Sequence, residues 1–178
     1  MRKPESMNVA ALFVRHNSIY KTMAGVDAWD AERDARNWPG GSPAVCHPPC
    51  AQWGRMAQWA HKKPSEKALA LLALDLVDRW GGVVEHPVTS RLWPHAEGRK
   101  GFLYTVDQQW FGHRAQKRTT LYINGIKPSE LPPIPYAMEE PTQPCQNMGK
   151  AERERTPPAM AEWLVSIASQ SAKLPEHK

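Results

Sequence analysis

The stretch SEKALALLALDLVDRWGGVVEHP, residues 65–87, places a helical pattern directly before a strand pattern. Ser65 is a suitable N-cap, and apolar residues recur at helical spacing from there to Trp80. The residues predicted on its buried face are Leu69, Leu72, Ala73, Leu76 and Trp80. A glycine pair ends the helix, and residues 83–86 form a predicted strand that stops at Pro87, because proline cannot donate a hydrogen bond to a sheet.

Residues 44–47 form a predicted strand before this helix, so the local order is strand, helix, strand. That order is typical of a parallel crossover with helices covering the sheet. The other predicted strands are residues 8–14, 26–30, 103–106 and 119–123. The sequence therefore predicts an α/β fold, a single Rossmann-like domain over residues 1–178 with a mostly parallel sheet and helices on both faces.

The carboxyl-terminal third begins with a proline-rich stretch. Residues 127–149 contain six prolines without periodicity, which predicts a long loop. A second helix is predicted over residues 156–170, with Thr156 as its cap and Pro157 at its first position. Its predicted buried face carries Met160, Trp163, Leu164 and Ile167.

Composition narrows the class of protein only in part. The chain has 178 residues, 41% of them hydrophobic, and a net charge of +5, which suits a polyanionic partner but also an ordinary protein. The longest apolar run, residues 68–74, is far shorter than the roughly 18 residues of a membrane span. The amino-terminal residues lack an apolar signal segment, so we expect a cytoplasmic protein with reduced cysteines and no membrane partner. Nothing in the sequence indicates an oligomeric state.

Cys50 and Glu85 are the residues best placed for chemistry. Cys50 follows Pro48-Pro49 at the end of one predicted strand, in a stiff loop, and Glu85 lies at the end of the next. Strand ends are where parallel sheets bind ligands. A cation such as Arg55 or His47 would lower the pKa of the thiol. Partial burial would raise the pKa of the Glu85 carboxyl group, making it a proton donor or a hydrogen-bonding partner.

Ordinary interpretations exist for the same residues. Cys50 could be an inert small side chain, and Glu85 could end a strand in a salt bridge. Cys46, His47 and Cys50, joined by His61, His86, His95 or Cys145, have the donor atoms for zinc, but the spacing of four residues across two prolines argues against it, so no metal is predicted. Trp53 and Trp59 are the tryptophans best placed to stack on a base.

Three segments together resemble the DNA cytosine-5 methyltransferase family. Pro48-Pro49-Cys50 is similar to that family's proline-proline-cysteine loop, and Glu85-His86-Pro87 to its glutamate motif. Residues 111–125, FGHRAQKRTTLYING, are similar to its aromatic-glycine motif, which leads through Gln and Arg into an apolar strand. Thr156-Pro157-Pro158 resembles the start of its closing helix. The resemblance covers residues 44–168 with gaps.

The resemblance implies a covalent reaction on a base extruded from DNA. Cys50 would add to C6 of the pyrimidine, Glu85 would contact N3, and Arg118 would steady the base or backbone. The residues implied to contact substrate are His47, Pro48, Pro49, Trp53, His86, His113, Arg114 and Lys117. S-adenosylmethionine would be the cofactor, with Phe13, Asp27 and Asp30 nearest to it, although no glycine precedes Gly25, where the family has a glycine-rich loop.

Two other functions fit the same sequence. One is a non-catalytic nucleic-acid-binding or regulatory protein on a methyltransferase-like fold, which the missing glycine loop would allow. The other is an enzyme that acts on free pyrimidine nucleotides with the same cysteine. A small enzyme of the resembled kind would be at home in a bacteriophage or in the cytosol of its bacterial host.

Overall fold

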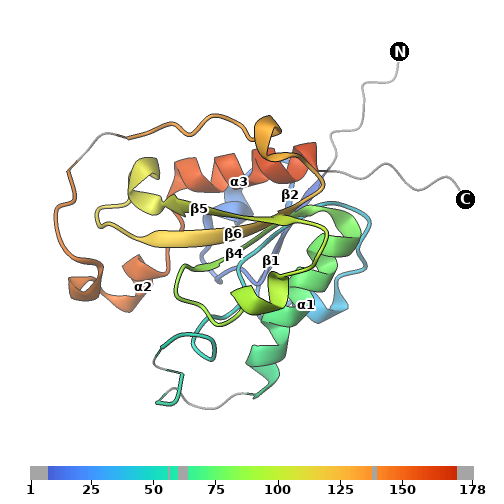
Figure 1. Ribbon diagram of the computed structural model, residues 1–178, viewed down its shortest axis with the longest axis horizontal. Helices are drawn as coiled ribbons and strands as arrows, with labels where there is room; N and C mark the ends of the chain where they lie inside the picture. Colours follow the sequence, from blue (N-terminus) through green and yellow to red (C-terminus); the bar gives the residue numbers. More distant parts are fainter. Residues whose placement is uncertain (1–7, 56, 60–63, 138–139, 172–178) are drawn as a thin grey trace, which may run out of the picture.

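The computed structural model describes residues 8–55, 57–59, 64–137 and 140–171, and its centre is one open sheet (Figure 1). Its six strands are β1 Val9–Leu12, β2 Val26–Trp29, β3 Ala44–Cys46, β4 Gly82–Pro87, β5 Phe102–Asp107 and β6 Arg118–Asn124. They lie side by side in the order β2-β1-β3-β4-β6-β5. The first four strands are parallel, whereas β6 runs antiparallel to both β4 and β5. The predicted α/β fold with a mostly parallel sheet is thus confirmed.

Two helices cover opposite faces of this sheet: α1 Pro64–Trp80 and α3 Pro158–Gln170 (Figure 1). Successive side chains of a strand point to opposite faces, so each strand serves both. In β3, Val45 packs with the α3 residues, while Ala44 and Cys46 pack with the α1 residues. The shorter helical elements are η1 Ile19–Thr22, η2 Ala35–Asn37, η3 Trp93–Ala96, η4 Gln108–Phe111, η5 Pro128–Glu130, η6 Cys145–Asn147 and α2 Lys150–Arg153.

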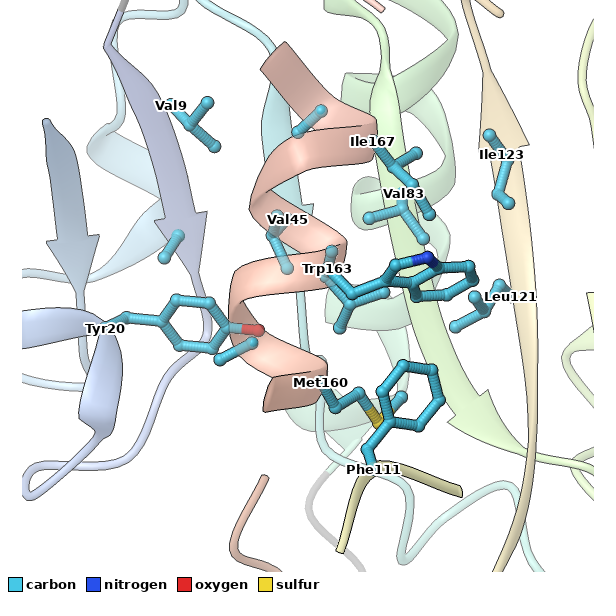
Figure 2. Packing of buried hydrophobic residues seen from close by; sticks show 14 of the residues in the cluster. Val9, Tyr20, Val45, Val83, Phe111, Leu121, Ile123, Met160, Trp163 and Ile167 are labelled. Carbon is cyan, nitrogen blue, oxygen red and sulfur yellow. The ribbon is translucent and has the colours of Figure 1, made fainter. Parts of the chain in front are cut away.

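The core on the α3 face follows the predicted helical spacing. The predicted face of α3, Met160, Trp163, Leu164 and Ile167, is buried against strand residues such as Val45 and Val83 (Figure 2). The helix begins one residue later than predicted. Pro157, expected at the first helical position, is the cap instead, with ψ at 141°. The reason is that Pro158 follows it, and a residue before proline is disfavoured in the α region.

The core on the α1 face differs from the prediction. The fully buried residues of α1 are Ala70, Ala73, Leu74 and Val77, whereas Leu69, Leu72 and Leu76 are only partly buried. Apolar residues surround most of this helix, so the sequence pattern did not distinguish the faces. The alanines let the helix backbone approach β3 and β4, and the longer leucines lie at the flanks of the contact.

The sheet geometry requires one glycine at the start of β4. Gly82 has φ at +116°, and a Cβ there would lie 1.9 Å from the carbonyl oxygen of Ala44. This close approach fixes how β4 pairs with β3, with Cys46 opposite Val84. The carboxyl ends of β1 to β4 therefore reach one edge of the sheet, where β5 also ends and β6 begins. We call this the carboxyl edge.

The described residues outside these helices and strands form the connections between them. In the described part of residues 127–149, the only regular elements are η5 and η6, as expected for a proline-rich loop. No helix within the described ranges combines the length and the apolar character that crossing a membrane requires.

Candidate functional site

The carboxyl edge brings Cys50 and Glu85 together, because β3 and β4 are neighbours in the sheet. The chain leaves β3 through His47-Pro48-Pro49-Cys50, and Glu85 lies near the end of β4. The loop between β5 and β6, residues 108–117, ends at the same edge. The loop after β3, the end of β4 and the β5–β6 loop, which are far apart in sequence, therefore meet at the carboxyl edge.

Glu85 is the centre of a buried polar network, which we call the Glu85 network: Tyr20, His47, Glu85, Gln108 and Thr119. His47 Nδ1 lies 3.1 Å from Glu85 Oε2, and His47 Nε2 lies 2.9 Å from the Tyr20 hydroxyl. The hydroxyl of Thr119 donates to Glu85 Oε1, and Gln108 Nε2 donates to the same oxygen at 3.5 Å. Both carboxylate oxygens are thus engaged, and Tyr20 connects the network to the α3 core (Figure 2).

The pKa of Glu85 is lowered, against the prediction that burial would raise it. Burial alone raises the pKa, but the hydrogen bond and charge of His47, the charge of Lys117 and the Thr119 hydroxyl together lower it to about 2. Glu85 is therefore ionised at neutral pH. An ionised carboxylate only accepts hydrogen bonds, so Glu85 is a hydrogen-bond acceptor and not a proton donor.

Cys50 is exposed at the carboxyl edge, where Trp53 and Gly54 donate backbone N–H bonds to its carbonyl oxygen. Its pKa is raised by partial burial of the thiol and by the charges of Glu85 and Glu154, against a lowering effect of Lys117. The prediction that Arg55 or His47 would activate the thiol is therefore wrong. His47 is instead paired with Glu85, whose negative charge opposes thiolate formation.

His86 positions the loop that carries Cys50. It is 1% exposed; its Nε2 lies 3.4 Å from the carbonyl oxygen of Pro49, and its Nδ1 lies 2.7 Å from the Ser90 hydroxyl. Burial lowers the pKa of His86, which favours a neutral ring that donates from Nε2 and accepts at Nδ1. Pro48 in the same loop is buried as well. His86 and Pro48, which the sequence analysis assigned to substrate, are thus part of the loop's support.

The neighbouring cations Lys117 and Arg118 differ in their relation to the site. Lys117 is partly buried, and its charge acts on both Glu85 and Cys50. Arg118 begins β6 one residue before Thr119, so alternation turns its side chain to the other face of the sheet, away from Glu85. It lines a separate hollow with Trp110 and Gln116. The structure places Lys117 at the site and not Arg118.

The other residues of the β5–β6 loop are held by their own contacts. Arg114 is exposed and paired with Glu152. His113 is 8% exposed; its Nδ1 lies 2.8 Å from the carbonyl oxygen of Ala115, while its Nε2 has no hydrogen-bond partner among the described residues. Arg114 thus lies at the surface in an ion pair, whereas His113 is buried.

The tryptophans after Cys50 lie in different environments. Trp53 is 2% exposed, donates to the carbonyl oxygen of Lys67 at 3.2 Å and packs edge-on against His95. It is a core residue, so its predicted stacking on a base is wrong for this conformation. Trp59 is 68% exposed.

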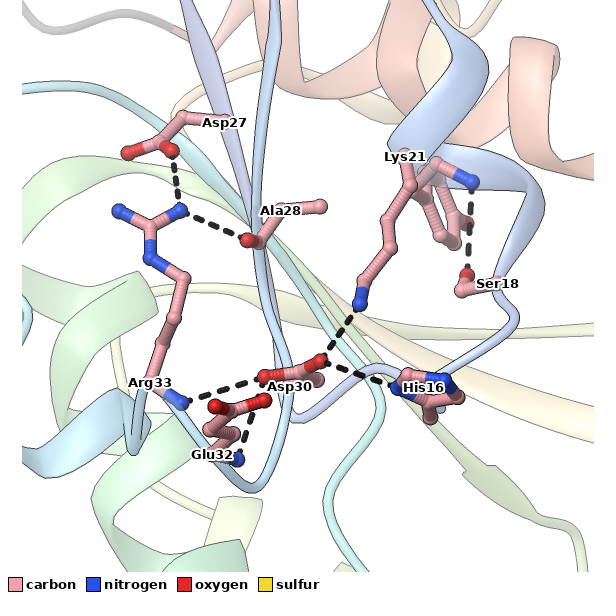
Figure 3. A network of polar contacts seen from close by, with 9 residues as sticks. His16, Ser18, Lys21, Asp27, Ala28, Asp30, Glu32 and Arg33 are labelled. Carbon is pink, nitrogen blue, oxygen red and sulfur yellow. Dashed lines mark hydrogen bonds and ion pairs between the residues drawn. The ribbon is translucent and has the colours of Figure 1, made fainter.

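Of the predicted cofactor residues, Phe13 follows β1, Asp27 lies within β2 and Asp30 follows β2. The two aspartates are bonded within the chain (Figure 3). Asp30 accepts from Lys21 Nζ at 2.5 Å and from the backbone N–H groups of Glu32 and Arg33, each at 3.2 Å. We call these residues, with His16 at 3.9 Å, the Asp30 network. Lys21 and these backbone contacts lower the pKa of Asp30 to about 2.

Asp27 and Phe13 complete this region. Asp27 pairs with the Arg33 guanidinium at 2.6 Å and accepts from the Trp29 indole at 2.8 Å. Phe13 stands where a glycine-rich loop would begin and has φ at 59°, a left-handed conformation that a bulky residue seldom adopts. This turn explains why β1 ends at Leu12, short of the predicted residue 14. Asp27 and Asp30 are thus committed to the loop after β2.

Among the residues that the structure describes, no three His, Cys, Asp or Glu side chains are grouped to hold a metal ion. His61, one of the ligands considered in the zinc alternative, lies outside the described residues.

Comparison with known proteins provides no family. No protein-family model matches the chain, and no curated protein is similar to it.

Several residues of the site had no clear signal in the sequence. Tyr20 and Gln108 reach Glu85 from a 3-10 helix and a loop, and neither belongs to a motif. Thr119 lies in a strand pattern whose alternation could have placed it beside Glu85, once the antiparallel pairing with β4 was known. Glu154 acts on Cys50 from more than one hundred residues away in sequence.

Proposed function

We propose that this protein is a DNA-modifying enzyme resembling a cytosine-5 DNA methyltransferase, in which Cys50 attacks C6 of a pyrimidine and Glu85 assists. The observation that carries the proposal is the placement of Cys50 and Glu85 at the ends of adjacent parallel strands, close enough for the charge of Glu85 to act on the thiol. The exposed sulfur and the ionised carboxylate face one edge, which a flipped-out base could reach.

The sheet order supports a Rossmann-like assignment. The parallel strands follow the order β2-β1-β3-β4, one of the doubly wound orders, in which ligands bind where the order reverses. That reversal lies between β1 and β3, at the carboxyl edge. The segment from His47 to Cys50 leaves the sheet at this place, so Cys50 would border the ligand site.

The proposed chemistry assigns one role to each group. The thiol of Cys50 gives its proton to solvent water, and Sγ forms a bond to C6. The electron pair of the C5–C6 double bond moves to C5, which takes up a proton from solvent or another electrophile. Glu85, ionised and acceptor-only, would accept a hydrogen bond from an N–H group of the base. Lys117 would offset negative charge near both groups.

The residues present do not fit S-adenosylmethionine in the way the resemblance implies. Phe13 takes the place of a glycine at the end of β1, and Asp30 is bonded to Lys21 and to its own loop. A ribose would have to displace these contacts. We therefore derive no step through this cofactor, and the group that C5 would receive stays open.

A second candidate is a non-catalytic DNA-binding protein on the same scaffold. The raised pKa of Cys50 favours it, because a protonated thiol is a weak nucleophile. The hydrogen bonds that Asp30 accepts from Lys21 and from the backbone of Arg33 also favour the non-catalytic protein, because Asp30 is then not free to bind a cofactor.

The proposal is tested by trapping on DNA that contains 5-fluorocytosine, with and without S-adenosylmethionine, followed by mass spectrometry of the complex. Cys50→Ala should abolish the adduct. Cys145→Ala, which changes a half-buried cysteine elsewhere, is the matched control and should leave the adduct unchanged. Deuterium exchange at C5 of unmodified cytosine provides a second readout that needs no methyl donor, because addition at C6 makes C5 basic.

Each outcome decides between the two candidates. An adduct or exchange that requires Cys50 supports the enzyme. DNA binding without adduct and without exchange over a range of alkaline pH overturns the enzyme and favours the binding protein. A parallel arm with free deoxycytidine monophosphate identifies an enzyme that acts on nucleotides.

A further inference from the structure

We propose that Arg15, Arg114 and Lys117 form a clamp for the phosphodiester backbone of DNA, and that the segment around α2 occupies this clamp in the free protein. This inference rests on the proposed function, because it names how the same site holds its polymer. Arg15 follows β1, whereas Arg114 and Lys117 belong to the β5–β6 loop. The three cations therefore converge on the carboxyl edge from two separate loops.

The segment around α2 makes one contact with each cation. The Nε of Arg114 donates to Glu152 Oε1 at 2.8 Å, and its Nη2 lies 2.6 Å from the same oxygen as an ion pair. Lys117 Nζ donates to the carbonyl oxygen of Arg153 at 2.6 Å, and Arg15 pairs with Glu154. Two carboxylates and one carbonyl oxygen thus stand where the oxygens of successive phosphates would bind.

This segment lies beside the nucleophile. The charges of Glu154 and Lys117 both act on the Cys50 thiol, so the α2 contacts border the place where a base would meet the sulfur. Figure 1 shows α2 beyond the end of the sheet at which β4 terminates. A strand of DNA that delivered a base to Cys50 would therefore meet α2 and its cations.

Among the described residues, the contacts of α2 and Glu154 with the three cations are polar contacts at the surface. None of the α2 residues is buried, whereas Met148 before the helix and Pro157 after it are. The side chains of its two ion pairs are 36% to 56% exposed, and exposed pairs of this kind contribute little stability. A polyanion can therefore replace them while Met148 and α3 keep the flanking chain anchored.

The test measures binding of a fluorescein-labelled DNA duplex by anisotropy in a Cys50→Ala background, so that covalent trapping does not contribute. Glu152→Gln with Glu154→Gln should tighten binding about tenfold at low salt, since both arginines are released for phosphates. The control is the double variant Glu97→Gln with Glu130→Gln, which changes the net charge by the same amount. Both acids are exposed; Glu97 precedes β5 and Glu130 follows β6. The control should tighten binding by less than about twofold.

Adding Arg15→Ala and Arg114→Ala to the Glu152/Glu154 variant completes the cycle. The gain in affinity should disappear. The slope of log affinity against log salt concentration should become shallower by the amount that about two phosphate contacts contribute. A gain equal to that of the control, or a gain that survives without the arginines, would overturn the clamp. Adduct formation is scored separately, so a clamp that binds DNA without an adduct rejects the enzyme and keeps the clamp.

Discussion

The two polar networks at the carboxyl edge differ in how far apart their members lie in sequence. In the Asp30 network, Lys21 and the bonded N–H groups lie within nine residues of Asp30. In the Glu85 network, His47, Thr119 and Gln108 lie 38, 34 and 23 residues from Glu85. A local network shapes one loop, whereas a long-range network fixes several elements relative to one another. The comparison therefore indicates that the Glu85 network holds the elements of the candidate site in position relative to one another.

The largest expected effect comes from removing the charge of the long-range network by Glu85→Gln. The pKa of Glu85 in the folded protein, about 2, lies below its ordinary value of 4.5. The ionised carboxylate therefore stabilises the fold above that ordinary value, and this contribution is lost as the pH falls towards 2. We expect the variant to lose about 3 kcal/mol of unfolding free energy at neutral pH and much less near pH 2.

Urea unfolding of both proteins over a pH series measures this difference. The difference between the two curves isolates Glu85, because Asp30, whose pKa is also lowered, is present in both proteins. If the difference in unfolding free energy between the two proteins is the same at neutral and at acidic pH, then the charge of Glu85 does not stabilise the fold.

The second prediction concerns the local network alone. Lys21→Met removes the main cause of the lowered pKa of Asp30, so this pKa should rise from about 2 towards its ordinary value of 3.8. The pKa of Glu85 should not move, since neither Lys21 nor Asp30 is among the groups that set it, although Tyr20 of the Glu85 network is the neighbour of Lys21 in η1. Carboxyl-carbon NMR titration of both residues checks the prediction. A shift in the pKa of Glu85 in this variant would show that the two networks are coupled and would contradict the distinction between them.

The smallest expected effect is on the reactivity of Cys50. Glu85→Gln removes a charge that raises the pKa of the thiol, so alkylation by iodoacetamide near pH 8 should be roughly threefold faster. Lys117→Ala removes an opposing charge and should slow it by a similar factor. Arg118→Ala is the matched control, because its side chain lies on the other face of the sheet. An Arg118 variant as slow as the Lys117 variant would contradict this placement.

Much of the fold follows from local patterns in the sequence. Strand and helix positions were predicted within a few residues, since proline and glycine stop elements where the structure ends them, as at Pro87 and Gly81. The buried face of α1 was predicted only at Ala73, because its apolar residues surround the helix and only contact with the sheet selects Ala70, Leu74 and Val77. The antiparallel place of β6 between β4 and β5 also needs the whole sheet.

The candidate site was predictable only where its residues follow strand ends. Cys50 and Glu85 share that property, so strand pairing brings them together. Their pKa values follow from burial and from His47, Lys117, Thr119 and Glu154, which meet only in three dimensions. This is why the direction predicted for each pKa was wrong although the two residues lie at the same edge of the sheet, as strand pairing predicts.

The place of α3 after all six strands has a consequence for biosynthesis. While the ribosome is still making the residues before Pro158, the strand residues Val9, Val45, Val83 and Leu121 have no helix to cover them. The nascent chain then displays an apolar sheet face, which is the kind of surface that chaperones bind and that aggregates. Completion of this core is thus delayed until α3 emerges, however early the sheet itself has paired.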